Sequence, residues 1–159
     1  MKSAKTQHFA IRIIKMKSGN YHHVTVTRDH IIKGVPRNCD RCAISLAMNE
    51  HFTNFIHENG FRDWRAETVT SICGFQVTYV SIKNLDKQKT TPSIRFSNEM
   101  EVWMDVFDSG TDDSVLTGQD ITDPITIIVD TKELKATMAV TKPPDKNQAS
   151  IWDLITGGE

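Results

Sequence analysis

The feature that most constrains the fold of this chain is an amphipathic pattern over residues 44–58. Apolar side chains recur there at helical spacing and form one continuous stripe, which predicts a long helix buried along one side. The stripe consists of Ile44, Ala47, Met48, His51, Phe52, Phe55 and Ile56. The opposite face is expected to meet water and carries Ser45, Asn49, Glu50, Asn54 and Glu58. Asn59 and Gly60 end the pattern, because glycine accepts the left-handed backbone of a helix C-cap.

Cys39 and Cys42 form a CxxC pair just before this helix, whose first turn we expect Asn38 or Asp40 to cap. The pair has three interpretations: half of a zinc site, a redox site whose thiolate is favoured by the helix N-terminus, or plain packing. The sequence has no second CxxC, and His51 lies too far along the helix from Cys39 to complete a metal site. Packing is therefore favoured. Zinc at Cys39 and Cys42 is the alternative, and no other cofactor is expected.

Most of the remaining chain has strand patterns. Segments 9–16 and 21–27 flank a turn at residues 17–20 and predict a hairpin, in which His22 and His23 point to opposite faces. Further strands are expected at 64–72 (with Trp64 and Val69 facing inward), 75–82, 93–96, 124–130 and, as an edge strand, 136–140. Ser97 is expected to cap a second helix with an apolar stripe of Met100, Trp103, Met104 and Phe107. The fold class that follows is α+β: a single domain with a mixed or antiparallel sheet of about five to seven strands and two main helices.

The segments between these elements are predicted to be loops. Thr27 or Asp29 is expected to cap a short turn that ends at Gly34, while residues 83–92 form a polar loop and residues 108–123 an acidic loop. Residues 1–140 form the predicted domain. Residues 141–159 are a linker and a short apolar tail, in which partner-binding candidates are Ile151, Trp152, Leu154 and Ile155.

Charge is balanced over the whole chain but not along it. The 159 residues carry a formal net charge of −1, yet residues 1–65 hold 11 Lys and Arg against 5 Asp and Glu, and residues 66–159 hold 8 against 15. Such a division favours contact with a polar partner or with a second copy of the chain, so we expect a homo-oligomer. No apolar run is long enough to span a membrane, and the polar N-terminus does not resemble a secretion signal.

Three stretches resemble a known pattern: VTRDHIIKGVPRNCDRCAISLAM, SIRFSNEMEVWMDVFDSG and PITIIVDTKEL. They are similar to a family of small uncharacterised proteins of tailed phages and actinobacterial prophages, over roughly residues 24 to 130. Ala43 stands where that pattern usually has proline, and the N-terminal strand and C-terminal tail are additional. The resemblance implies a phage or prophage origin, a compact α+β fold and a location in the host cytoplasm. It implies no activity.

The favoured hypothesis is a phage-encoded, non-enzymatic accessory binding protein. It would act as a counter-defence or host-takeover inhibitor that binds a host or defence protein, or sequesters a nucleotide signal. A nucleotide would be held by the helix start together with Arg37, Asn38, Asp40 and Arg41, with His30 nearby. One alternative is a zinc- or thiol-dependent enzyme centred on Cys39 and Cys42, although no known catalytic motif is present. The other is a nucleic-acid-binding regulator that uses the basic N-terminal half.

Overall fold

The computed structural model of the chain describes residues 21–109 and 122–139. These residues form an α+β domain, as the sequence predicts, with three helices and one seven-stranded mixed sheet. The strands are β1 (Tyr21–Val26), β2 (Trp64–Ser71), β3 (Gly74–Ser81), β4 (Gln88–Thr90), β5 (Ile94–Phe96), β6 (Ile125–Asp130) and β7 (Lys135–Met138). The helices are α2 (Arg28–Lys33), α3 (Ala43–Glu58) and α4 (Asn98–Asp108).

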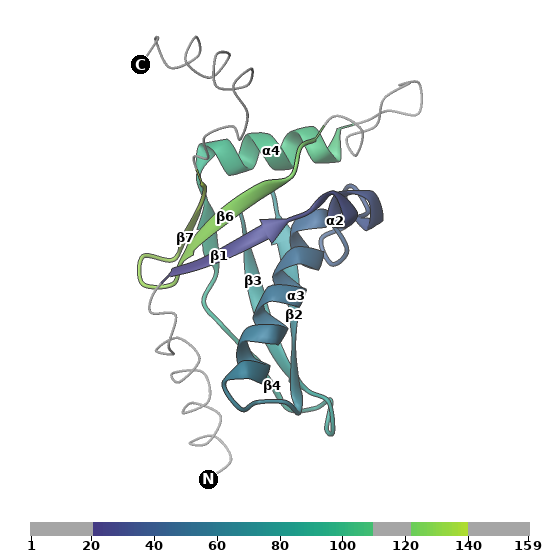
Figure 1. Cartoon of the computed structure of the whole chain (residues 1–159), viewed down its shortest axis with the longest axis vertical. Coiled ribbons are helices and arrows are strands. Elements are labelled where there is room, and N and C mark those ends of the chain that lie inside the picture. The colour runs from purple at the N-terminus through teal and green to yellow at the C-terminus, as the bar shows by residue number, and fades with distance from the viewer. Residues whose placement is uncertain (1–20, 110–121, 140–159) are drawn as a thin grey trace.

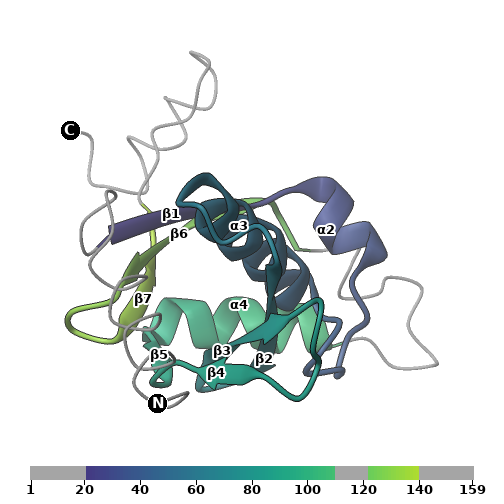
Figure 2. The same cartoon turned by 90° about the horizontal axis from the view of Figure 1, so that it is seen from below.

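The strands lie in the order β1-β6-β7-β5-β3-β2, and β4 pairs with β3 beside this path. All pairs are antiparallel except β5 with β7. The sheet curls into an arc, and α3 lies on the open side of the arc between β1 and β2 (Figures 1 and 2). Two predictions about the sheet are wrong. Residues 88–90 form a strand rather than part of a loop. β7 was expected at an edge of the sheet, but it is an interior strand because it pairs with β6 on one side and with β5 on the other.

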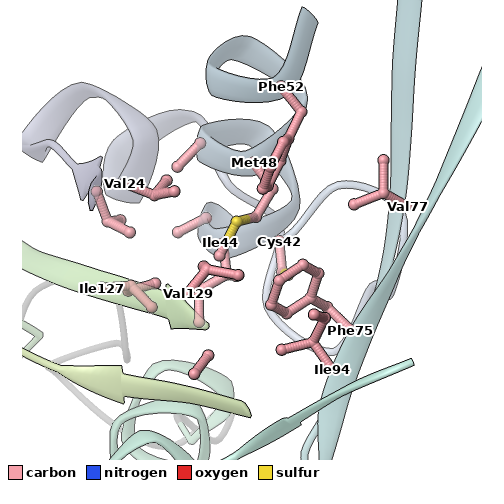
Figure 3. Packing of buried hydrophobic residues seen from close by; sticks show 14 of the residues in the cluster. Val24, Cys42, Ile44, Met48, Phe52, Phe75, Val77, Ile94, Ile127 and Val129 are labelled. Atoms are coloured by element: carbon pink, nitrogen blue, oxygen red, sulfur yellow. The ribbon is translucent and has the colours of Figure 1, made fainter. Parts of the chain in front are cut away.

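The apolar stripe of α3 faces the inside of this arc, which confirms the predicted helix. Figure 3 shows Ile44, Met48 and Phe52 on α3 between Val129 of β6 on one side and Phe75 and Val77 of β3 on the other, and all belong to one buried cluster. The predicted stripe of α4 is also confirmed, since Met100, Trp103, Met104 and Phe107 are all buried. Burial of each large apolar side chain stabilises the fold by about 1.5–3 kcal/mol before conformational entropy is counted, so the two helices and the sheet form one cooperative core.

The face of α3 that was expected to meet water packs partly on β2. Ser45 is fully buried and its Oγ lies 2.7 Å from Thr70 Oγ1. We call this contact between α3 and β2 the seam. At one end of it Ala66 N–H donates to Thr53 Oγ1 (2.9 Å). At the other end Thr70 N–H donates to Cys39 O (2.9 Å). These contacts satisfy backbone groups along the outer edge of β2 and so protect this edge from pairing with another chain.

The strand face that packs on α3 also differs from the prediction for β2. Val69 is 51% exposed, whereas Ala66, Thr68 and Thr70 point inward and are buried. The prediction placed the large apolar residue inside, but the small and β-branched polar residues are the ones that fit against the nearby helix. The hydroxyl of Thr70 is satisfied by its hydrogen bond to Ser45 on α3, whereas Thr68 Oγ1 has no hydrogen-bond partner among the described residues.

The helix caps are confirmed in part. Thr27 caps α2, which ends at Gly34, and Ser97 caps α4, as predicted. For α3 the prediction is wrong, because the cap is Cys42, whose Sγ accepts from Ser45 N–H at 3.4 Å. Asn38 instead closes the preceding loop, where its Oδ1 accepts hydrogen bonds from the backbone N–H groups of Asp40 and Arg41.

Several predictions concern residues outside the described ranges. They are the strand at 9–16, the turn at 17–20, the acidic loop over 110–121, and the linker and tail with Ile151, Trp152, Leu154 and Ile155. Within the described ranges, none of the helices has the length and apolar character needed to cross a membrane.

Candidate functional site

The predicted ligand-binding loop lies before α3, with Arg37, Asp40 and Arg41 exposed. Its backbone is held in place by the N–H of Arg37, which donates to Asp108 Oδ1 at the end of α4 (2.8 Å). The side chains at the start of α3, Ala43 and the residues on either side of it, are buried. A phosphate bound here would meet the two exposed arginine side chains.

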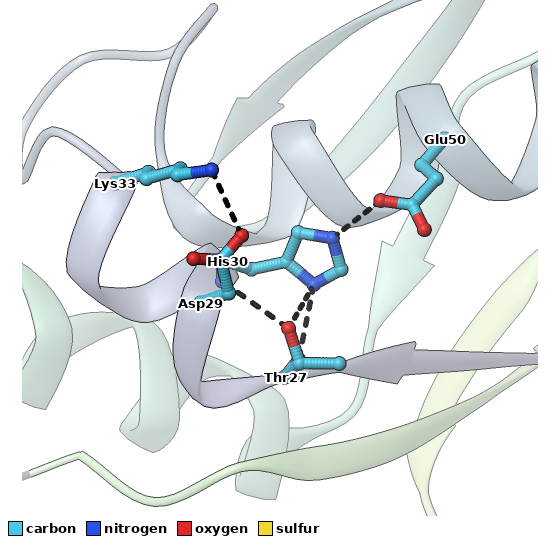
Figure 4. Close-up of polar contacts among 5 residues, drawn as sticks. All are labelled: Thr27, Asp29, His30, Lys33 and Glu50. Carbon is cyan, nitrogen blue, oxygen red and sulfur yellow. Dashed lines mark hydrogen bonds and ion pairs between the residues drawn. The ribbon is translucent and has the colours of Figure 1, made fainter.

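His30 lies apart from that loop, and both of its ring nitrogens are engaged within the protein (Figure 4). Thr27 N–H donates to Nδ1 at 3.0 Å, so Nδ1 is an acceptor and the ring proton is on Nε2. Nε2 then donates to Glu50 Oε2 on α3 at 2.8 Å. The ring thus completes the N-terminal cap of α2 and ties α2 to α3, which is a structural role.

The two CxxC cysteines have different environments. Cys39 is exposed and Cys42 is buried in the core at the start of α3. No group of three or more histidine, cysteine, aspartate or glutamate side chains within residues 21–109 and 122–139 has the arrangement of a metal site. Cys42 is thus a capping and packing residue here, and zinc at this pair stays an untested alternative.

A groove that the sequence did not predict runs between β1 and α3. Its volume is about 570 Å³, within the range of roughly 300–1,000 Å³ usual for ligand sites. The lining comes from β1 with Tyr21, His22, His23 and Thr25, from α3 with Glu50, His51, Asn54 and Glu58, and from His30 at one end. Residues from both faces of β1 line it, so the groove follows the edge of this strand and not one face of the sheet.

The floor of the groove is a pair of histidines. His22 and His23 point to opposite faces of β1, as predicted, and His22 is the one that points inward. Its Nδ1 lies 3.1 Å from His51 Nε2. Phe52 and Phe55 surround the His22 ring at centroid distances of 5.0 and 4.6 Å. Burial, and then the neighbouring His51, lower the pKa of His22 to about 4, and burial also lowers the pKa of His51. Both rings are therefore neutral at neutral pH.

The charge of the groove follows from its lining. Glu50 and Glu58 contribute two carboxylates, and there is no lysine or arginine among the described residues that line it. The imidazoles on the floor are neutral, and Glu50 accepts a hydrogen bond from His30, so Glu58 is the carboxylate without an ion pair among the described lining residues. The groove favours a cationic group over a phosphate.

A larger depression of about 780 Å³ lies at the turn between β2 and β3, near Cys73. Arg95, Glu133 and Lys135 surround it with charges of both signs, from exposed positions on β5, in the turn between β6 and β7, and on β7. It has no buried polar group comparable to the histidine pair, so we give the groove beside β1 priority.

Two signals in the sequence point to the groove in retrospect. His51 falls within an apolar helical stripe, and His22 falls on the inward face of an alternating strand. Each position alone fits a buried core histidine. That the two rings meet depends on how the curled sheet places β1 beside α3, which the pattern along the chain does not contain.

Comparison of the chain with protein-family models, with curated proteins and with solved structures finds no match.

Proposed function

We propose that this chain is a non-enzymatic binding protein that captures an extended segment of a partner along the free edge of β1. The captured segment would lie in the groove against α3 and add a strand to the sheet. The observation that carries this proposal is the difference between the two outer strands of the sheet. β2 has its outer edge covered by α3, whereas β1 pairs only with β6 in the described part of the chain.

The direction of the backbone groups on β1 follows from hydrogen bonds further along the sheet. Ala139 N–H donates to Thr126 O, so the backbone groups of Thr126 face β7. Direction alternates along an antiparallel strand, so Ile127 faces β1, where it lies opposite Val24. Every second residue of β1 thus bonds β6, and the others point their N–H and C=O groups into the groove. These others are Tyr21, His23 and Thr25.

An open edge of this kind is a template for another strand. Peptide-recognition proteins use it by strand addition, in which main-chain hydrogen bonds supply affinity and neighbouring side chains supply specificity. Here the groove provides the side chains, because α3 and β1 present histidine, glutamate and asparagine beside the edge.

The family resemblance bears on which partner this is. It implies a phage or prophage origin, and the partner would then be a host or defence protein in the host cytoplasm, with the chain acting as a counter-defence inhibitor. Sequestration of a nucleotide signal is less well supported at this groove, because the two carboxylates would repel its phosphates.

A proline on the open edge tests the proposal. The N–H of Thr25 points away from β6, so Thr25→Pro removes a donor needed for strand addition and leaves the bonds between β1 and β6 in place. Peptides selected on the full-length protein from a random displayed library would be measured by fluorescence anisotropy against this variant. We expect them to lose binding by at least about 10-fold.

Thr25→Val is the matched control, since it keeps the N–H and should lose far less binding than Thr25→Pro does. Circular dichroism and a denaturation curve of both variants establish that they are folded, and His23→Pro repeats the test at a second outward position. Selected peptides that bind Thr25→Pro and Thr25→Val equally, or a library that yields no binder, would overturn the proposal.

A further inference from the structure

Resting on the proposed function, we infer that the captured segment carries a lysine or arginine whose side chain is held by Glu58 beside Tyr21. This names the chemistry of the partner, which strand addition alone leaves open. The site lies at the end of the groove where Tyr21 begins β1 and Glu58 ends α3.

The charges around the groove are the first support. Glu50 and Glu58 lie two helical turns apart on the same side of α3, and both line the groove. One oxygen of Glu50 already accepts from His30 Nε2 at 2.8 Å, whereas no described residue forms an ion pair with Glu58. Glu58 is therefore the carboxylate with the greater capacity for a new cation.

The histidine floor is the second support. Glu58 is close enough to His51 to favour its protonated form, but burial outweighs this and keeps the ring uncharged at neutral pH. The carboxylate thus has a neighbour that could have neutralised it and does not. A basic side chain from a partner would supply the missing positive charge at this exposed carboxylate.

Tyr21 is the third support. Its ring is 57% exposed although it is large and apolar, and it lines the same groove as Glu58. An aromatic face beside a carboxylate suits a lysine or arginine, whose charge is attracted to the ring and whose aliphatic stem packs on it.

The same charges argue against a second copy of this chain as the occupant. Two β1 edges paired with each other would bring the carboxylates of both α3 helices together with no lysine or arginine from either strand. Like charges opposed in this way are unfavourable, so the groove fits a different, basic segment better than it fits itself.

The test uses three synthetic ten-residue peptides of alternating threonine and valine that differ at one central position, which is lysine, norleucine or glutamate. Their affinities for the full-length protein are measured by fluorescence anisotropy at low and high salt. We expect the lysine peptide to bind about 10-fold more tightly than the norleucine peptide, the glutamate peptide to bind most weakly, and salt to reduce the lysine advantage.

Three variants assign the effect. Glu58→Gln should remove the lysine advantage while it leaves the norleucine affinity unchanged. Glu67→Gln, an exposed glutamate on β2 away from the groove, should change nothing. Tyr21→Leu should reduce the lysine affinity by a smaller factor, about 2- to 5-fold.

The outcomes separate this inference from the function beneath it. If all three peptides bind equally and Glu58→Gln has no effect, the basic residue is wrong and strand addition stands. If none of the three binds, strand addition itself fails and the inference fails with it. A dimer by analytical ultracentrifugation that Thr25→Pro dissociates would identify a second copy as the occupant, which also overturns the inference.

Discussion

His22 and His51 meet between β1 and α3 with Nδ1 of one ring 3.1 Å from Nε2 of the other. A hydrogen bond between two imidazoles needs one proton, so one ring donates and the other accepts. A proton added to both rings would place two cations at this distance among Phe52 and Phe55, where water cannot screen them. The pair therefore ties a strand to a helix in a way that acid weakens.

The first prediction concerns stability against pH. The pKa of His22 is about 4 in the folded chain and about 6.5 when unfolded, so the unfolded state binds more protons between these values. Stability contributed by the neutral ring is complete above pH 6.5 and is lost as the pH falls toward 4. We expect this group to account for a loss of about 3 kcal/mol in the free energy of unfolding, measured by urea denaturation across that range.

His22→Phe isolates this effect, because phenylalanine fills the aromatic pocket and does not titrate. The variant should lose markedly less stability than the wild type between pH 6.5 and 4. His23→Asn changes the exposed neighbour on the other face, which is the smallest of the three causes that lower the pKa of His22, so this variant should retain most of the pH dependence of the wild type. Equal pH dependence in the wild type and His22→Phe would refute the assignment to His22.

The second prediction concerns the seam between α3 and β2. Thr68 Oγ1 and Asn49 Oδ1 are buried with no hydrogen-bond partner among the described residues. They lie between two satisfied contacts of the seam, at Thr70 and at Ala66. An unpaired buried hydroxyl costs about 1–3 kcal/mol, so Thr68→Val should raise the free energy of unfolding by about 1 kcal/mol.

Thr70→Val is the matched control for that experiment. It lies two residues along the same face, but its hydroxyl is bonded to Ser45 at 2.7 Å, so its loss should destabilise the protein by about 1 kcal/mol. If Thr68→Val is destabilising to the same extent, a bound water satisfies Thr68 and Asn49, and the hydroxyl is not an orphan.

The two long helices could be predicted because their signals are local. The stripes of α3 and α4 and the cap at Ser97 each depend on residues within a few turns of one another. The strands at 64–71, 74–81 and 94–96 were also recognisable from composition and turn residues. The fold class followed from the number and type of these elements.

The groove could not be predicted because it depends on the order of strands. Nothing near residues 21–26 indicates that β6, about 100 residues later, takes one side of β1 while no described strand pairs with its other side. The interior position of β7 and the burial of Ser45 have the same origin, since each depends on a distant strand that packs there. The cap at Cys42 was not predicted because side chains with an oxygen acceptor, such as Asn38 and Asp40, are the usual N-caps of helices.

The third prediction concerns the three cysteines. Cys39 and Cys73 are exposed, whereas Cys42 is 1% exposed within the core. A thiol reagent such as DTNB should label two cysteines quickly in the native protein and the third only at the rate of unfolding. Cys42→Ser should leave the fast phase unchanged. Protection of Cys39 by added zinc would favour the metal interpretation of the CxxC pair and contradict the packing one.

The last prediction concerns the contact between the end of α2 and the start of α3. A side chain on Gly34 would bring its Cβ within 2.6 Å of Ala43 N and 2.8 Å of His30 O, both backbone atoms that cannot move aside singly. Gly34→Ala should therefore lower the free energy of unfolding by about 2–3 kcal/mol, as overpacking does in a close-packed interior.

Gly60→Ala is the comparison that separates crowding from backbone conformation. Gly60 has a φ of 97° but open space where a Cβ would stand, so its replacement should cost about 1 kcal/mol through conformation alone. Denaturation curves of both variants provide the measurement. If Gly34→Ala costs no more than Gly60→Ala, α2 can move away from α3, and the bond from His30 to Glu50 does not hold the two helices rigidly together.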